Sequence, residues 1–282
     1  GSNTNRIETK DITSSGNNID FGDLTVSYRY RYAANSATKN FIAGGEGTTV
    51  IDVFTLGSKG NAVDFGDITT SKSKGSGVSN GVTGVYGAGD THPGGVFQNV
   101  IESFSMSTFG NTSDFGDLTV SRQLVSSNSN GHGGLQEQPQ RAPELYSPTG
   151  KPLVSGAVGV GDLWMYARNG ALEFGSVATL GNGVDFGDCS QGTLNCSSST
   201  RGIHGKANVS SSFTEYVEYS TKGNAAFFGD ATVNRQSCQG GSNSTRGMFF
   251  GGETPSSSDV IDYITIATIG NSTDFGDLTQ AR

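Results

Sequence analysis

The sequence predicts an all-β fold, a β-propeller of about six four-stranded antiparallel blades. A motif, Asp-Phe-Gly-Asp, occurs at residues 20–23, 64–67, 114–117, 185–188 and 274–277, with a degenerate copy at 227–230. Successive copies are 44, 50, 71, 42 and 47 residues apart. Short apolar runs lie between turn residues in each interval, and none keeps a helical period. A repeat of this length indicates one supersecondary unit per copy, as in a propeller blade.

The last repeat shows how one blade is built. Residues 241–247 are small and polar, and they lead into an apolar strand at 248–250 that ends at a glycine pair. Residues 260–267 are β-branched and aromatic, a composition that suits a half-buried strand. Gly270-Asn271 then turns the chain into a closing strand at 274–282. This is about four strands in about 46 residues, the content of one antiparallel blade.

The earlier repeats have the same order of segments. The glycine-pair half returns at residues 35–45, 80–89 and 196–203, and the strand before Gly-Asn returns at 50–56, 101–108 and 216–221. Six motif copies therefore flank five glycine-pair halves. We expect six blades, of which the first, holding residues 7–25, is incomplete. A five-bladed propeller with overlapping ends and a fragment of a longer β-repeat array are the alternatives.

The chain is expected to form a single propeller domain over residues 1–282, with an insertion of about 25 residues within 133–172. The insertion accounts for the 71-residue step and holds four of the six prolines and the only tryptophan. Insertions in repeat proteins lie on one face, which often binds a partner, and Trp, Tyr and Arg are frequent in interfaces. The candidate partner or receptor contacts are Tyr146, Trp164, Tyr166 and Arg168. In the alternative interpretation, residues 163–167 are simply the second strand of this blade.

Charge and hydropathy exclude several kinds of partner. The formal net charge of −8 and the absence of a basic run argue against nucleic acid. No apolar stretch approaches the length of a membrane span, and no signal-peptide pattern opens the chain, so we expect no membrane insertion. The leading Gly1-Ser2 is either a cloning remnant or a processed end.

The repeated motif has three interpretations. Asp-Phe-Gly also occurs in the magnesium loop of kinases, but that role needs one copy and partner motifs that this chain lacks. Paired carboxylates beside Gly-Asn are hard oxygen ligands that suit calcium. The calcium candidates are Asp20, Asp23, Asp64, Asp67, Asp114, Asp117, Asp185, Asp188, Asp274 and Asp277.

We favour the third interpretation, in which each Asp caps turn amides and each Phe packs between blades. The degenerate copy has Phe227 in place of the first Asp, and a structural motif tolerates that loss more easily than a metal site does. No cofactor and no metal are therefore expected. The packing phenylalanines are Phe21, Phe65, Phe115, Phe186, Phe228 and Phe275.

No catalytic set is assembled in the sequence, so we expect a protein that is not an enzyme. His92, His132 and His204 are isolated, and no serine lies in a nucleophile-elbow motif. The three cysteines do not make a disulfide framework, although a Cys189–Cys196 bridge is an alternative. A glycan hydrolase, the least favoured class, would need two carboxylates converging within about 5–10 Å.

The repeat resembles two groups of proteins. The glycine pair after the second strand and the arginine after the fourth strand (Arg122, Arg235, Arg282) resemble the kelch-type propeller, although the blade tryptophan of that family is absent. Residues 270–279, Gly-Asn-Ser-Thr-Asp-Phe-Gly-Asp-Leu-Thr, are more similar to the repeat arrays of virion or tail-associated proteins from tailed phages of marine bacteria.

This resemblance implies a non-catalytic structural protein on the virion surface, such as a decoration, spike or tail-fibre module. Its partners would be other virion proteins, further copies of itself, or a host surface. The alternative is a carbohydrate- or receptor-binding propeller head.

Overall fold

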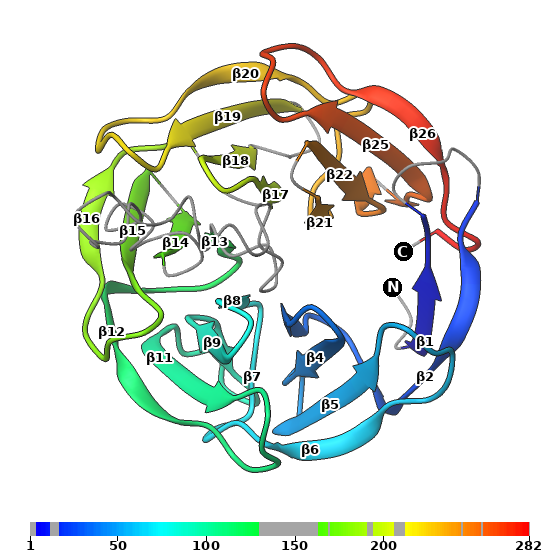
Figure 1. Ribbon diagram of the computed structural model, residues 1–282, viewed down its shortest axis with the longest axis vertical. Helices are drawn as coiled ribbons and strands as arrows, with labels where there is room; N and C mark the ends of the chain where they lie inside the picture. The colour runs from blue at the N-terminus through cyan, green and yellow to red at the C-terminus, as the bar shows by residue number, and fades with distance from the viewer. Residues whose placement is uncertain are drawn as a thin grey trace, which may run out of the picture.

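The computed structural model describes residues 4–11, 17–129, 163–168, 170–190, 194–205, 212–243, 245–254 and 256–281. In this part of the chain, five four-stranded antiparallel sheets are arranged around a central axis as the blades of a propeller (Figure 1). The predicted all-β propeller is confirmed. The complete blades number five, as in the five-bladed alternative, rather than about six.

Within each blade the strands run in chain order from the centre of the ring to its rim (Figure 1). The first two blades consist of β3 (Tyr32–Asn35), β4 (Lys39–Ala43), β5 (Val50–Thr55) and β6 (Val63–Asp67), then β8 (Ser76–Ser79), β9 (Thr83–Gly87), β11 (Gln98–Ser105) and β12 (Ser113–Arg122). The third consists of β13 (Ser126–Ser129), β14 (Leu163–Arg168), β15 (Ala171–Ser176) and β16 (Val184–Gly187).

The fourth and fifth blades complete the set. They consist of β17 (Leu194–Ser197), β18 (Arg201–Gly205), β19 (Phe213–Glu218) and β20 (Ala226–Asp230), then β21 (Gln239–Ser242), β22 (Arg246–Phe250), β25 (Val260–Thr265) and β26 (Thr273–Asp277). Two short hairpin sheets belong to the connecting loops: β7 (Lys72–Ser73) with β10 (Asp90–Thr91), and β23 (Glu253–Thr254) with β24 (Ser256–Ser257).

The N-terminal strands β1 (Thr4–Thr9) and β2 (Ile19–Tyr28) form a two-stranded sheet between the last blade and the first (Figure 1). Ile7 lies opposite Gly22 and Glu8 opposite Asp20, the register that Ile51 and its neighbour adopt in the first blade. The sheet therefore corresponds to the third and fourth strands of a blade. The incomplete unit expected at residues 7–25 has this outer half alone among the described residues.

Each motif places a β-bulge in the fourth strand of its sheet. Opposite Ile51 and Asp52 the ladder passes from Gly66 to Asp64 and skips Phe65, and the other sheets show the same register shift. A bulge re-aims the extra side chain, and here it turns the phenylalanine inward. All six motif phenylalanines are buried, as packing between blades requires: Phe21, Phe65, Phe115, Phe186, Phe228 and Phe275.

The phenylalanines join neighbouring blades through aromatic contacts. The Phe65 ring lies 5.0 Å from Phe41 in its own blade and 5.7 Å from Phe104 in the next blade. Phe21 of β2 meets Phe54 of the first blade at 5.4 Å. Burying one such side chain stabilises the fold by roughly 1.5–3 kcal/mol. The hydrophobic core is therefore distributed between the blades around the ring.

The motif glycine contacts the Gly-Asn turn of the following blade. A Cβ on Gly66, whose φ is +155°, would lie 2.3 Å from the Gly110 carbonyl oxygen. Beside it the Asn111 Oδ1 atom accepts a hydrogen bond from the Asp67 amide at 3.0 Å. The same glycine contact recurs for Gly22 with Gly60, Gly116 with Gly181, Gly187 with Gly223 and Gly229 with Gly270. The motif glycine and the Gly-Asn turn thus contact each other across these blade boundaries.

The sequence insertion interrupts the third blade between its first and second strands. Residues 130–162, which include Tyr146, lie outside the described residues. The run 163–168 is β14, paired with β13 on one side and β15 on the other. This agrees with the alternative interpretation, in which these residues are the second strand of the blade.

We predict that Gly66→Ala lowers the free energy of unfolding by about 2–5 kcal/mol, because the new methyl group meets backbone atoms that have little room to move. Urea unfolding followed by fluorescence measures the change. Gly57→Ala is the matched control, since nothing lies within 4 Å of a Cβ at that position. Equal stability of the two variants would contradict the proposed blade contact.

Candidate functional site

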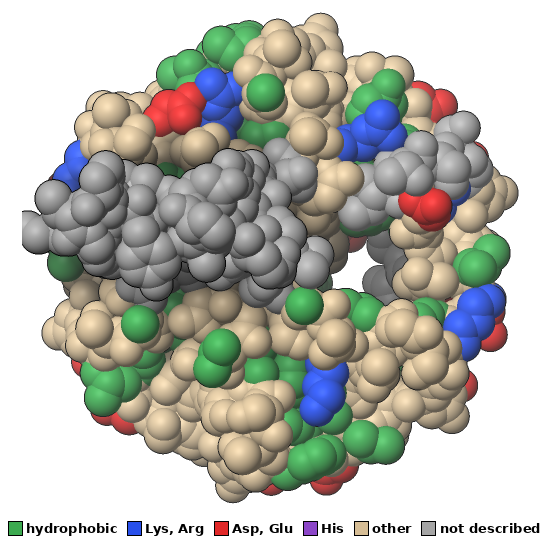
Figure 2. All heavy atoms as spheres, in the orientation of Figure 1, with side chains coloured by type: hydrophobic (Ala, Val, Ile, Leu, Met, Phe, Trp, Pro, Cys, Tyr) green, Lys and Arg blue, Asp and Glu red, His purple; other side chains and the backbone are tan. Residues whose placement is uncertain are grey.

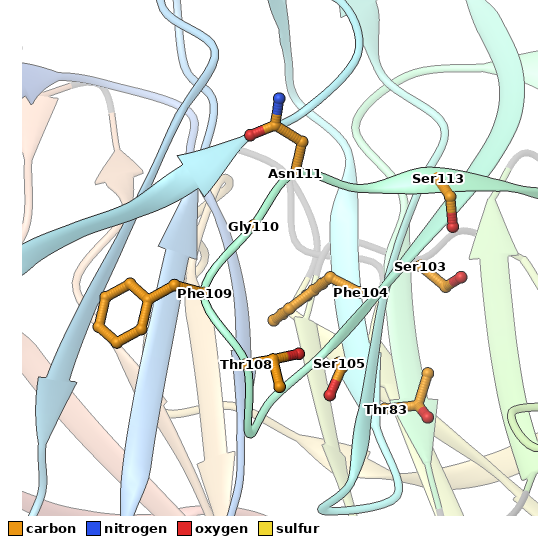
Figure 3. A pocket seen from close by; sticks show the side chains of 9 residues that line it. All are labelled: Thr83, Ser103, Phe104, Ser105, Thr108, Phe109, Gly110, Asn111 and Ser113. Atoms are coloured by element: carbon orange, nitrogen blue, oxygen red, sulfur yellow. The ribbon is translucent and has the colours of Figure 1, made fainter.

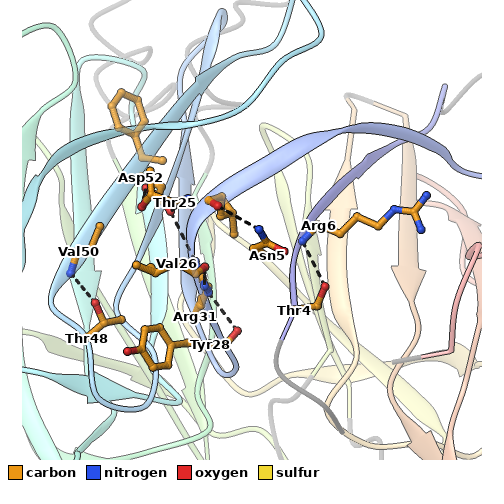
Figure 4. A network of polar contacts seen from close by, with 12 residues as sticks. Thr4, Asn5, Arg6, Thr25, Val26, Tyr28, Arg31, Thr48, Val50 and Asp52 are labelled. Carbon is orange, nitrogen blue, oxygen red and sulfur yellow. Dashed lines mark hydrogen bonds and ion pairs between the residues drawn. The ribbon is translucent and has the colours of Figure 1, made fainter.

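The buried polar residues of the ring lie at the blade boundaries, where they form a repeated contact that we call the inter-blade clamp. After each motif, a threonine or serine hydroxyl donates a hydrogen bond to a carboxylate on the third strand of the next blade. Thr25, for example, donates from its amide and its hydroxyl to Asp52, at 3.1 and 2.5 Å (Figure 4). The other pairs are Thr69–Glu102, Thr119–Glu173, Ser190–Glu215 and Thr232–Asp262.

The same clamp closes the ring. Thr279, which follows the last motif, donates a hydrogen bond from its hydroxyl to Glu8 on β1. The Asn18 amide donates to the Asp277 carbonyl oxygen at 3.4 Å, the bond that Ala62 makes with Asp23 at 2.8 Å in the first boundary. The N-terminal sheet is therefore held against the last blade by the contacts that join complete blades.

In five clamps a cation also contacts the carboxylate, including the closing clamp, where Arg6 lies 3.6 Å from Glu8. Arg31 lies 3.7 Å from Asp52 and Arg235 lies 3.0 Å from Asp262, and the other pairs are Lys72–Glu102 and Arg122–Glu173. Lys72 and Glu102 are only 1% and 0% exposed. Buried ion pairs of this kind are costly to break from one side, because the remaining charge is left without compensation.

The clamps differ in the direction in which their surroundings shift the pKa of the carboxyl group. Burial raises the pKa of Glu102, but Lys72 and the Thr69 and Thr112 donors outweigh it and bring the pKa below its ordinary value. For Asp52, burial outweighs the hydrogen bonds from Thr25 and the charge of Arg31, so its pKa is raised. Both carboxylates are fully used in joining blades, which leaves neither as an accessible catalytic acid or base.

The calcium candidates lie on or directly beside the outer strands, and two of them cap turns. Asp64 and Asp274 each accept a hydrogen bond from the amide two residues further on, both at 3.1 Å. The first aspartate of each complete motif is exposed to solvent. Within the described ranges, no group of three or more His, Cys, Asp or Glu side chains is placed to hold a metal ion.

The candidate partner contacts are not on the surface where the structure describes them. Trp164 and Tyr166 are both 0% exposed and pack edge-on, with ring centroids 5.4 Å apart. The Tyr166 hydroxyl donates to the Ser76 carbonyl oxygen at 3.1 Å, which ties the third blade to the second. The prediction that these two side chains contact a partner is therefore corrected: they are core residues. Tyr146 and the Arg168 side chain lie outside the described residues.

His204 was not predicted as a core residue, yet it is 0% exposed on the second strand of the fourth blade. Its ring lies 3.3 Å from the Asn128 side-chain nitrogen and 3.4 Å from the Ser126 hydroxyl, both in the third blade. Burial lowers the pKa of His204 to about 3. The imidazole is thus neutral in the folded ring and does not meet exposed His92 in a ligand set.

The three cysteines are free and buried, so the alternative Cys189–Cys196 bridge is not formed. Burial raises the pKa of Cys189 to about 12 and that of Cys196 still further from its ordinary range. A thiol held in its neutral form is a poor nucleophile and metal ligand. These cysteines serve as small apolar core residues.

The accessible surface offers shallow features. The face in Figure 2 is largely uncharged, with scattered apolar side chains. Phe109, Leu180 and Ile269 each precede a Gly-Asn turn and are 65%, 72% and 59% exposed. A depression of about 400 Å³ lies beside Phe109, lined mostly by hydroxyl-bearing side chains such as Thr83, Ser105 and Thr108 (Figure 3). The depression was not predicted from the sequence, although all of its lining residues except Thr83 lie between Ser103 and Ser113.

Comparisons with known proteins leave the family open. No family model matches the chain, and no curated protein matches it. No helix in the described part of the chain is long and apolar enough to cross a membrane.

We predict that Lys72→Met lowers the free energy of unfolding by about 3–5 kcal/mol, because it leaves the Glu102 charge buried without its cation. Urea unfolding measures the loss. The double variant Lys72→Met/Glu102→Gln should recover much of the stability. If it is no more stable than the single variant, the charge is not the cause.

We predict that His204 makes the fold weaker in mild acid. The unfolded chain binds a proton on this residue below pH about 6.5, whereas the folded chain does so only near pH 3. Stability should therefore fall as the pH drops through this window, by up to roughly 1.4 kcal/mol per pH unit. His204→Gln should remove that part of the pH dependence in urea midpoints measured between pH 7 and 5. His92→Gln, at an exposed position, should keep it.

Proposed function

We propose that this propeller is a non-catalytic structural module that presents loops for contact with other proteins or with a surface. One observation carries the proposal: the buried polar residues that recur at the blade boundaries are used in joining blades. The clamp carboxylates are engaged by hydroxyl groups or cations of the neighbouring blade, and Asp64 and Asp274 of the motif cap turns. What differs from blade to blade is the loops.

The variable loops lie at one end of the blades. The connections from second to third strand are a short glycine-rich turn at residues 44–49, a longer loop at 88–97 that carries β10, and a loop at 251–259 that carries β23 and β24. Variation on a fixed scaffold is typical of binding loops. By strand alternation, the Gly-Asn turns, which connect the third strand of a blade to the fourth, lie at the opposite end. Loops available for contact with a partner therefore lie at both ends of the ring.

The proposed place of this module is a phage particle. The support is the resemblance of the Gly-Asn-x-x-Asp-Phe-Gly-Asp-Leu-Thr repeat to virion and tail-associated arrays. Such a module would contact other virion proteins, further copies of the chain or the host surface. The repeated buried contacts that close the ring stabilise it, and a protein on the surface of a particle needs such stability.

A second candidate, glycan binding, is favoured by the depression beside Phe109. Sugar sites commonly combine an exposed aromatic ring with hydroxyl and amide groups, and this depression offers both in Phe109, Ser105 and Asn111. The Trp164 and Tyr166 side chains no longer support this candidate, because they are buried.

We predict that gold-labelled antibody against this chain marks one defined position on the native phage particle in electron micrographs. The purified chain should also bind that particle's other proteins without hydrolysing glycans. Glycan hydrolysis that a single Asp or Glu substitution abolishes would contradict the non-catalytic role. A glycan-array signal that Phe109→Ala removes and the control Leu180→Ala keeps would establish the second candidate instead.

A further inference from the structure

In the part of the chain that the structure describes, the two inner strand positions beside β1 hold no strand, and we call this place the open half-blade. In every complete blade the third strand pairs with the second strand on its inner side, as β5 does with β4. Among the described residues, β1 belongs to a sheet of two strands and has a ladder partner only in β2. Figure 2 shows the ring hollowed at this place. A sheet edge of this kind is a template for an added strand.

The strands that flank the open half-blade are less covered than their counterparts. Innermost strands contact one another in a series that runs from β3 through β8, β13 and β17 to β21. In β21, Gln239 is exposed and the other three residues are half-buried, whereas the first three residues of β13 are all buried. The open half-blade is thus continuous with the interfaces that blades make elsewhere.

The first blade turns apolar and polar groups toward this position. The residue of the second strand opposite the clamp carboxylate packs against the preceding blade: Tyr86, Tyr166, His204 and Phe249 are each 0% exposed there. Ile42 holds this place in the first blade and is only half-buried. Two residues away on the same face of the strand, Asn40 is a polar residue that is also half-buried.

The second strand of the fifth blade has a large residue at a position where the other four blades have a small one. The next residue of the second strand is small in four blades, namely Ala43, Gly87, Ala167 and Gly205. The reason is visible at Gly87, where an added Cβ would lie 2.6 Å from the Tyr166 hydroxyl of the next blade. The fifth blade has Phe250 at this place, half-buried and packed against the cluster that holds Phe275, on the blade face that Lys10 of the N-terminal segment also contacts.

We propose that the open half-blade binds an extended strand of a partner protein, which adds antiparallel to β1 as the third strand of its sheet. The flanking residues define its side chains. Its residue opposite Glu8 faces Phe250 and must be small, and its residue opposite Ile7 faces Ile42 and must be a large apolar one. This order is the reverse of the order in the chain's own second strands. A second strand with the sequence of this repeat therefore does not fit the open half-blade. The occupant that fits is a strand of a partner protein with a different sequence.

The proposal rests on the proposed function, since it specifies one partner contact of the module. Its test needs only the purified chain and two peptides, so it can fail while the location of the chain in a particle still stands. The first peptide has the core Thr-Gly-Val-Ala-Leu-Ala. The second, Thr-Gly-Val-Tyr-Gly-Ala, copies residues 83–88 of this chain. Both carry the same Lys-Ser extensions at each end.

The first peptide should bind the wild-type chain at least about tenfold more tightly than the second in calorimetry, because the tyrosine would overlap Phe250. At about 100 times its Kd it should raise Tm by about 5 °C, and it should protect β1 amides from hydrogen exchange. Phe250→Gly should reverse the preference by making room for the tyrosine, while Phe227→Gly, at an exposed position of another blade, should leave it unchanged.

Three results would overturn the proposal. They are no binding of either peptide, equal binding of both to the wild-type chain, and a preference that Phe250→Gly does not alter. Sedimentation that shows a dimer of the chain, dissociated by the first peptide, would identify a second copy as the occupant and would also overturn it.

Discussion

The contact between a motif and the Gly-Asn turn of the next blade is the constraint on which the rest of the ring depends. It brings two backbones so close that only glycine fits at the motif position, as at Gly66, where a Cβ would lie 2.3 Å from the Gly110 carbonyl oxygen. The bulge that permits this approach also turns Phe65 into the space between blades. One local distortion of the strand therefore sets both the spacing of the blades and the packing of the core.

The inter-blade clamps add polar specificity to that packing. A propeller blade has a similar apolar face in every repeat, so hydrophobic contact alone does not fix the register of one blade on the next. A carboxylate that must meet a hydroxyl group, and in five clamps a cation, accepts only one arrangement without leaving a buried charge uncompensated. The exact partners vary, as Lys72 with Glu102 and Arg235 with Asp262 show, while the geometry is kept.

Ring closure follows from the same contacts. Thr279 meets Glu8, and the Asn18 amide meets the Asp277 carbonyl oxygen, although these residues lie at opposite ends of the described chain. A half-blade can take the place of a whole blade here because the clamp uses only the third and fourth strands. The inner positions are not needed for closure, which leaves them free to differ from the repeat, as Phe250 does.

The sequence by itself determined the fold class, the order of strands within a blade and the burial of the motif phenylalanines. These features are local, because they depend on turn residues, strand composition and a spacing that repeats along the chain. The alternative interpretation placed a strand at residues 163–167, where β14 lies, whereas the interpretation that put Trp164 and Tyr166 in a partner contact was wrong. Aromatic residues beside an irregular repeat interval are as compatible with a protein interior as with an interface. The sequence pattern therefore does not distinguish the two.

Only the tertiary structure decided which blade each residue faces. The hydroxyl–carboxylate pairs of the clamps lie 25 or more residues apart in the sequence. No periodic pattern within one strand identifies the residue that it contacts in the next blade. The same holds for the burial of His204, the number of complete blades and the open half-blade beside β1. These properties arise when the ring closes, because closure brings distant strands side by side and excludes water between them.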